Sequence, residues 1–300
     1  MKKTDASFRI ILRVLSFVVF FSLTYISASS YAQYLTGPVA SGLGGAGRAA
    51  VDEGELILLN PAAVVHATAF SSAIFYEDGY LDKNTHDRAT GVNLVDNSEG
   101  LFISGGYTYI NRRRTFDQIA TREENYHQVS LGKFVAKHFS VGAAITYLDS
   151  NIIGGRSFDQ LDYSLAVHYN PDPDTGFGLV VYNLAAHNKN IQAEILNRNV
   201  ISLGVHYMYM PQFRFRFDLS KQTEENPDKK FRYQMGLESH VSKFLTTRIG
   251  YDSNNLADRR AYTLGLCFDG PRLKADYFYS KNIDYNGGAM HGVDLRLPFW

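Results

Sequence analysis

The 300-residue chain has little of several features that define common protein classes. It contains one cysteine, Cys267, so no disulfide within the chain can stabilise it in an oxidising compartment. Its formal net charge is zero, which argues neither for nor against an anionic partner, and we expect no nucleic-acid partner. Beyond one short apolar run near the start, no segment is long and apolar enough for a transmembrane helix.

Motifs for catalysis and metal binding are also missing. Nine histidines are scattered along the chain, and none forms an HExxH motif or a close Cys/His set, so we expect no metal and no cofactor. His127, His168 and His206 fall on expected strands, where structural or lumen-facing roles are favoured over catalysis. The glycine-rich run 42–47 is not a phosphate-binding loop, because no Gly-Lys-Ser/Thr follows it. The sequence predicts a protein that is not an enzyme.

The first 32 residues have the form of an export signal. Four basic residues precede or flank the start of an apolar run at 14–26, and a small–x–small cleavage site ends at Ala32. The alternative is a retained transmembrane helix, but the run is shorter than the roughly 18 to 20 residues that span a bilayer. We therefore expect residues 1–32 to be a cleaved signal peptide and the mature chain to start at Gln33.

Period-two alternation of apolar and polar residues follows the signal and is clearest in the second half. Phe213, Phe215 and Phe217, for example, alternate with charged residues, which gives a strand one apolar and one polar face. About fourteen such segments are expected, each near the ten or so residues of a tilted membrane strand. They lie at 69–78, 88–95, 100–110, 123–134, 138–149, 159–169, 175–184, 198–209, 212–221, 230–240, 243–252, 260–269, 271–281 and 289–300. Short links follow the even-numbered segments and longer polar links, such as 111–122 and 185–197, follow the odd ones, as in outer-membrane barrels.

The solvent decides which face looks outward. Lipid accepts Phe, Leu and Tyr but penalises Arg or Lys at mid-depth by about 2 to 4 kcal/mol, so the charged faces are expected to line a lumen. Small residues such as Ser140, Gly142, Ser202 and Gly204 favour a crowded barrel interior over a soluble sandwich. The sequence thus predicts an all-β fold, a transmembrane antiparallel up-and-down β-barrel over 69–300. The expected lumen-facing charged residues are Arg214, Arg216, Asp218, Arg232, Glu238, Arg248, Lys274, Asp276, Asp294 and Arg296.

Residues 33–68 do not look like a strand ladder. They contain a glycine-rich run with Gly42, Gly44 and Gly45, an acidic turn at 51–54, and an Asn60-Pro61 step. A fourteen-stranded barrel is wider than the eight strands whose side chains fill the inside, so we expect this segment to be an N-terminal plug, or hatch. The alternative is an exposed periplasmic tail.

Residues 42–62, GLGGAGRAAVDEGELILLNPA, resemble the start of the long-chain fatty-acid transporter superfamily of outer-membrane proteins, which includes the PorV-type barrels. The resemblance implies fourteen strands around an N-terminal hatch shaped by Asn60 and Pro61. It also implies an inward kink in the third strand, where Gly105-Gly106 permits a bend; the alternative is that this pair accommodates the plug or an aromatic neighbour. Two departures are short loops and an ionic lumen, which suits anionic head groups better than acyl chains.

The resemblance and the expected architecture lead to a hypothesis of passive passage for small hydrophobic or amphipathic compounds, gated by the hatch. The alternatives are a PorV-like adaptor that binds a secreted protein, and a structural barrel without cargo. The ending Phe299-Trp300 resembles the signal read by the barrel-assembly machinery of Gram-negative outer membranes. Arg112-Arg113-Arg114, expected on an outer loop, suits contact with lipopolysaccharide phosphates or is a solvated charge run. Expected partners are therefore outer-membrane lipids, lipopolysaccharide, the assembly machinery and one hydrophobic molecule or secreted protein.

Overall fold

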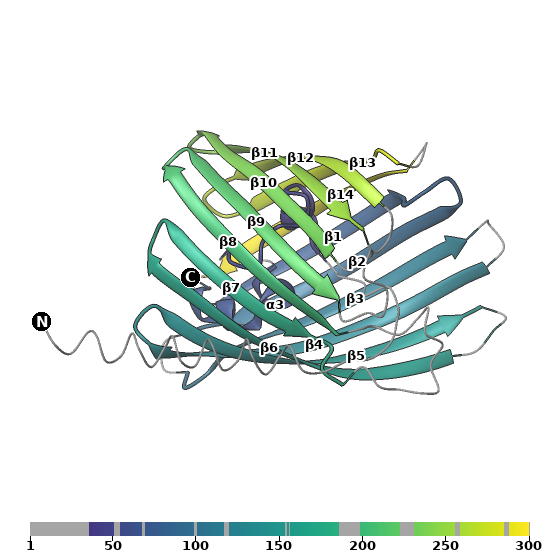
Figure 1. Cartoon of the computed structure of the whole chain (residues 1–300), viewed down its shortest axis with the longest axis horizontal. Coiled ribbons are helices and arrows are strands. Elements are labelled where there is room, and N and C mark those ends of the chain that lie inside the picture. Colours follow the sequence, from purple (N-terminus) through teal and green to yellow (C-terminus); the bar gives the residue numbers. More distant parts are fainter. Residues whose placement is uncertain are drawn as a thin grey trace, which may run out of the picture.

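The computed structural model shows a closed barrel of fourteen antiparallel strands, in which each strand pairs with the next and β1 pairs with β14 (Figure 1). The strands are β1 (Phe70–Tyr80), β2 (Thr85–Asp96), β3 (Ser104–Phe116), β4 (Ala120–Ala136), β5 (Phe139–Ile152), β6 (Ser157–Asp172), β7 (Thr175–Tyr182), β8 (Val200–Met210), β9 (Phe213–Gln222), β10 (Phe231–Ser242), β11 (Leu245–Asn254), β12 (Arg259–Asp269), β13 (Lys274–Asn282) and β14 (Ala289–Phe299). The all-β barrel and its strand number, predicted from alternation, are confirmed.

The structure describes residues 36–50, 55–67, 70–98, 101–116, 120–153, 155, 157–185, 199–222, 231–255, 259–284 and 288–299. The expected signal peptide, the acidic turn at 51–54 and Trp300 lie outside these residues. Among the described residues, no helix is long and apolar enough to cross a bilayer.

The exterior is apolar around the barrel. Ile74, Leu165, Ile249 and Leu264 each expose more than half of their side-chain surface. Their neighbours in sequence face inward and, apart from the partly exposed Gly250, are buried, as the period of two requires. An apolar band of this kind on a closed barrel faces lipid, and a closed barrel leaves no sheet edge unpaired in the membrane.

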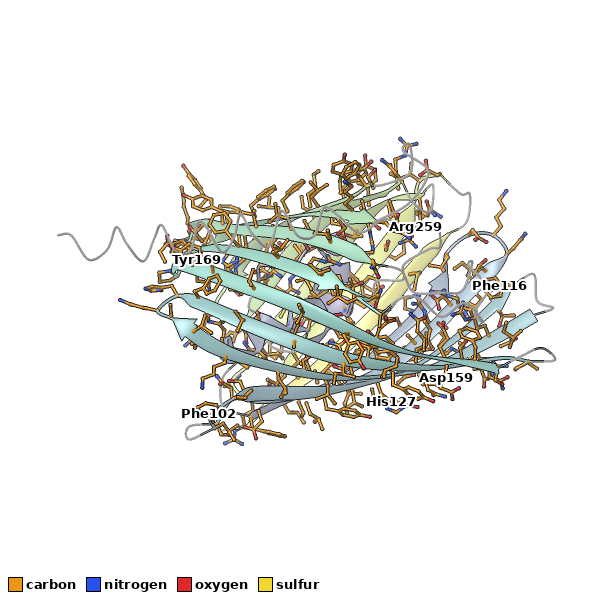
Figure 2. The ribbon with its side chains drawn as sticks, turned by 60° about the horizontal axis from the view of Figure 1, so that its bottom comes forward. Phe102, Phe116, His127, Asp159, Tyr169 and Arg259 are labelled. Atoms are coloured by element: carbon orange, nitrogen blue, oxygen red, sulfur yellow. The ribbon has the colours of Figure 1, made fainter. Side chains whose placement is uncertain are left out.

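Strands β3 to β6 contain more residues than the other strands. They have 13, 17, 14 and 16 residues, whereas an apolar band of about 25 Å needs only about ten tilted residues. Figure 2 shows Phe116 at one end of the barrel and Phe102 and Tyr169 at the other. The short turns lie at the end with Phe102 and Tyr169, which we take as periplasmic. The tall strands therefore extend past the membrane on the extracellular side.

This extension corrects two expectations. Most of the expected outer link 111–122 is strand, because β3 continues to Phe116 and β4 begins at Ala120. The arginine run is consequently in β3 and not on a loop: Arg112 and Arg114 contact the buried Asp87, and only Arg113 is exposed. Outside the lipid band both faces of a strand can be polar, so alternation stops although pairing continues.

Candidate functional site: a hatch on the inner wall

The described parts of the N-terminal segment, 36–50 and 55–67, lie inside the barrel, and we call them the hatch (Figure 1). Its elements are α2 (Pro38–Ser41), α3 (Leu56–Leu59) and the 3-10 helix η1 (Pro61–His66). The first half is held by an acid from the second. The buried Glu55 carboxylate accepts hydrogen bonds from the backbone N–H groups of Val39 (2.7 Å) and Ala40 (2.9 Å) at the start of α2. These donors have no partner within a helix, so Glu55 joins the two halves.

The Asn60-Pro61 step has a defined mechanical role. Asn60 is extended, and its side-chain oxygen accepts from Ala62 N at 2.9 Å, which caps η1. Pro61 occupies the first helical position, where no N–H is needed. The amide nitrogen of Asn60 donates to Arg48 O at 2.7 Å. One residue thus starts η1 and ties it to the glycine-rich run.

A buried ion pair fixes that run to the wall. Asp218 Oδ2 on β9 accepts from Gly47 N at 2.8 Å, from Arg48 N at 3.1 Å and from Arg48 Nη1 at 2.8 Å. Arg48 is fully buried and also donates to Gln234 Oε1 at 2.9 Å. Sequence analysis placed Asp218 on the inner face but missed Arg48. The sequence signal that could have indicated a buried ion pair is a single arginine within a run of small residues.

Glycines on the wall make room for the hatch. At Gly236 an added Cβ would lie 2.6 Å from Leu43 Cβ, and at Gly250 an added Cβ would meet the backbone of Gly44. Gly44 itself has a positive φ of 66°, a conformation that glycine adopts without strain. The wall glycines that face the hatch in this way are Gly106, Gly132, Gly142, Gly178, Gly204, Gly236, Gly250 and Gly265. They belong to eight different strands, so the hatch rests on most of the circumference.

Hydroxyl groups on the wall complete the seating. Thr263 Oγ1 donates to Gly42 O at 3.0 Å and accepts from Gly44 N at 2.9 Å. Ser140 Oγ donates to Ala62 O at 2.6 Å. Of the small inward residues that sequence analysis singled out, Ser140, Gly142 and Gly204 lie directly against the hatch, whereas Ser202 bonds Ser220 within the wall at 2.7 Å.

Around the glycine-rich run, the inner wall of β9 to β14 carries a network of alternating charges. Glu238 pairs with Arg214 (3.4 Å), Arg216 (3.4 Å) and Arg248 (2.7 Å). Asp276 joins Arg248 to Arg296, and Arg296 also contacts Asp294 at 3.0 Å. Arg232 pairs with Asp252 at 2.8 Å. Lys274 is the exception among the expected residues: it starts β13 at the rim, is partly exposed and pairs with Asp269.

The expected kink in the third strand is not found. Within described β3, the ladders with β2 and β4 reach Phe116 without a register shift. Gly106 instead lies against the hatch, since a Cβ there would be 2.7 Å from Ile57 Cγ2, while Gly105 lies beside Leu131. The link before β3 is held as well, because Asn97 Nδ2 donates to Val65 O and Ala67 O. Of the tandem glycines, Gly106 is therefore the one that accommodates the plug.

On another side of the lumen, on β1 to β4, apolar side chains pack against the hatch, beside Gln128 and Ser130 of β4, which both donate to Ile57 O. A cluster at mid-height is followed toward the periplasmic end by a second one, and α3 contributes to both. We call the two clusters the apolar track: Leu58, Phe75, Ala89 and Ile110 with Tyr126 packed against them, then Leu56, Ile57, Ala63, Val64, Val65, Ala67 and Val95. On the extracellular side the track is preceded by the ion pairs of Asp87 with Arg112 and of Arg122 with Glu124.

No group of His, Cys, Asp or Glu side chains within the described ranges forms a metal-binding set. No protein-family model matches the chain, and no characterised protein matches it in sequence. Solved structures do match. The CymD monoaromatic hydrocarbon channel has a TM-score of 0.68 and 14% identity, covering 90% of this chain and 99% of that one.

Two further structures have the same architecture. The toluene transporter TbuX of Ralstonia pickettii has a TM-score of 0.66 at 11% identity, over 89% of this chain and 99% of its own. A FadL homologue of Pseudomonas aeruginosa has a TM-score of 0.65 at 11% identity, over 92% and 100%. The chain therefore has the fold of the FadL-type transport channels, the architecture that the N-terminal resemblance implied. Its closed strand ladder and apolar exterior are those of an outer-membrane β-barrel.

Proposed function

We propose that this barrel passes small hydrophobic or amphipathic compounds across the outer membrane and that the hatch gates the passage. The observation that supports this is the apolar track, in which wall residues such as Phe75 and Ile110 pack against α3 of the hatch. An apolar molecule gains about 25 cal/mol for each Å² of surface that it removes from water. The track offers such a surface beside a movable segment, whereas β9 to β14 offer charges.

With the hatch seated, a compound that enters from the extracellular side meets the inner-wall groups in a fixed order. A compound first meets the ion pairs around Asp87 and Arg112, which suit a polar or anionic group, and then the apolar track, which suits a hydrocarbon part. Passage requires α3 to leave the wall, because all four of its residues are buried. No energy source is required when a compound moves down its own gradient.

The test is uptake of a labelled monoaromatic hydrocarbon by intact Gram-negative cells whose lipopolysaccharide leaflet slows direct entry. Ile110→Asn places an amide in the track, and Val200→Asn is the matched control. Both side chains are almost fully buried on the inner wall, but Val200 lies outside the track. We expect expression of the protein to raise uptake, Ile110→Asn to lower it, and Val200→Asn to retain it. Equal uptake with and without the protein would reject the proposal.

The seating of the hatch on eight strands also supports a second candidate, a permanently closed adaptor that binds a secreted protein. That function requires no uptake and no conductance under any condition, together with a protein partner that co-purifies in stoichiometric amount. A conducting or transporting protein without such a partner excludes it.

A further inference from the structure

Three histidines meet where the hatch contacts β6 and β8, and neither the Arg48–Asp218 pair nor the apolar track uses them. His66 is the last residue of η1, while His168 and His206 face inward from the wall. The rings of His66 and His168 have centroids 5.0 Å apart. His206 Nδ1–H donates to the hatch carbonyl of Ala49 at 2.6 Å. The three rings therefore lie on the seam between hatch and wall.

The hydrogen bonds of His168 fix a neutral ring. The Asn60 amide nitrogen donates to Arg48 O and lies 3.4 Å from His168 Nδ1, so this ring nitrogen must act as the acceptor. The proton is then on Nε2, which donates to Asn170 Oδ1 at 2.7 Å. A second proton, on Nδ1, would point at the N–H₂ group of Asn60. Protonation therefore opposes the residue that caps η1 and holds the glycine-rich run.

His66 also favours the neutral form while the hatch is seated. Its Nε2 is buried without a hydrogen-bond partner, and its ring packs edge-on against Phe134 at 5.0 Å. Burial, and then the positive charge that His206 can carry, hold the pKa of His66 below its ordinary value. A proton on His66 would be both desolvated and close to other positive groups.

The charges around the seam do not offset added protons. The hatch contributes Arg48, β6 contributes His168 and β8 contributes His206. From β9 come Arg216, which is opposite His206 in the ladder, and the buried Asp218, which is opposite Gly204 and pairs with Arg48 at 2.8 Å. The carboxylates nearest in the chain, Asp172 and Asp174 at the β6–β7 turn, are exposed. Glu238, the carboxylate next to Arg216, is already shared with two further arginines. Acidification thus adds positive charge to a seam whose nearest buried carboxylates, Asp218 and Glu238, are already paired with arginines.

We propose that His66, His168 and His206 form a pH-sensitive latch, which holds the hatch on β6 to β8 at neutral pH and releases it when the rings are protonated. The inference rests on the proposed gating function and names its regulation. The neutral rings stabilise the seated hatch above the ordinary histidine pKa of about 6.5, and this stabilisation is lost as the pH falls below that value. Release of η1 withdraws the neighbouring α3 from the wall residues of the apolar track.

Hydrogen–deuterium exchange on the refolded protein tests the latch without any cargo. Exchange of the hatch peptide 55–67 is compared at pH 7.5 and 5.0 with that of β9, after correction for the intrinsic pH dependence of exchange. We expect the relative protection of the hatch to fall by about tenfold per pH unit below about 6.5 for each fully linked proton, which is about thirtyfold at pH 5.0. Planar-bilayer recordings should show opening events at pH 5.0 that are rare at pH 7.5.

Neutral variants identify the groups. His168→Gln retains an oxygen that accepts from Asn60 but cannot gain a proton, and His66→Gln removes a ring whose Nε2 has no partner. The matched control is His127→Gln: His127 lies on the outer face of β4, where its Nδ1 contacts Tyr107 Oη at 2.8 Å (Figure 2). We expect the pH response to fall in either variant and to vanish in the triple variant that adds His206→Gln, whose amide can still donate to Ala49 O, with His127→Gln unchanged. Heat-modifiable gel migration checks folding, and His66→Gln alone carries the test if His168→Gln does not fold.

Two results would overturn the latch. One is equal hatch protection at both pH values in the native protein. The other is a pH response that survives in the folded triple variant, or that keeps its full native size in folded His66→Gln. Because exchange needs no transported compound, a failed latch leaves hydrocarbon uptake at pH 7.5 intact. Failed uptake with a working latch rejects the proposed passage and leaves the pH response of the hatch standing.

Discussion

Removal of the Asp218 carboxylate tests whether the Arg48–Asp218 pair holds the hatch. Asp218→Ala deletes three hydrogen bonds to the hatch and leaves the guanidinium of Arg48 buried without its carboxylate. Breaking a buried pair in this way costs about 3 to 5 kcal/mol. Arg48 still donates to Gln234 and Gly45, so we expect the lower end. At 1.36 kcal/mol per factor of ten, about 3 kcal/mol raises the population of unseated hatch by about a hundredfold.

The matched control is Asp252→Ala, which breaks a buried aspartate–arginine pair that lies wholly within the wall. Asp252 accepts from Arg232 Nε at 2.8 Å and Nη2 at 3.0 Å. The open fraction in planar bilayers and the exchange of peptide 36–50 should rise strongly in Asp218→Ala and little in Asp252→Ala. The double variant Arg48→Met/Asp218→Leu should recover much of the seating, because it leaves no orphaned charge. Equal behaviour of the two single variants, or no recovery in the double variant, would refute the reasoning.

Three further predictions concern the seat, the cap and the last strand. Gly236→Val puts a branched side chain where a Cβ would already lie 2.6 Å from Leu43 Cβ, so the hatch should lose protection while the barrel keeps its heat-modifiable migration. Asn60→Ala removes the cap of η1 and should cost about 1 kcal/mol in hatch exchange; a wild-type exchange pattern would contradict the assigned role. Phe299→Ser with Trp300→Ser should reduce assembly into the outer membrane, seen as less heat-modifiable barrel in that fraction, and normal insertion would remove the assembly assignment.

The alternation of apolar and polar residues predicted the barrel correctly in the part of each strand that faces lipid. Phe213 and Phe215 face the membrane, and Arg216 faces the lumen. Because lipid lies on one side of β9 and the polar interior on the other, apolar and polar residues alternate along the strand. The prediction of an outer loop failed at the extracellular ends of β3 and β4, because both faces are polar there. The outward Arg113 pairs with Glu123, and the inward Arg112 and Arg114 contact Asp87.

The hatch could be located from its composition but its contacts could not. Asn60-Pro61 is a local signal, since a cap and a proline act within a few residues. The Arg48–Asp218 pair joins residues 170 positions apart, and the seam of His66 with His168 depends on how the segment folds back inside the tube. The tandem glycine at 105–106 was ambiguous between bend and seat, and only its proximity to Ile57 decides it.

The ring of inward glycines has a consequence for how this protein can change over evolution. The missing side chains form a negative imprint of one particular peptide, spread over eight strands from β3 to β12. Because Gly236 and Gly106 already lack side chains, a larger residue at Leu43 or Ile57 could not be accommodated by a smaller residue opposite it. The hatch and the barrel wall are therefore constrained to change together.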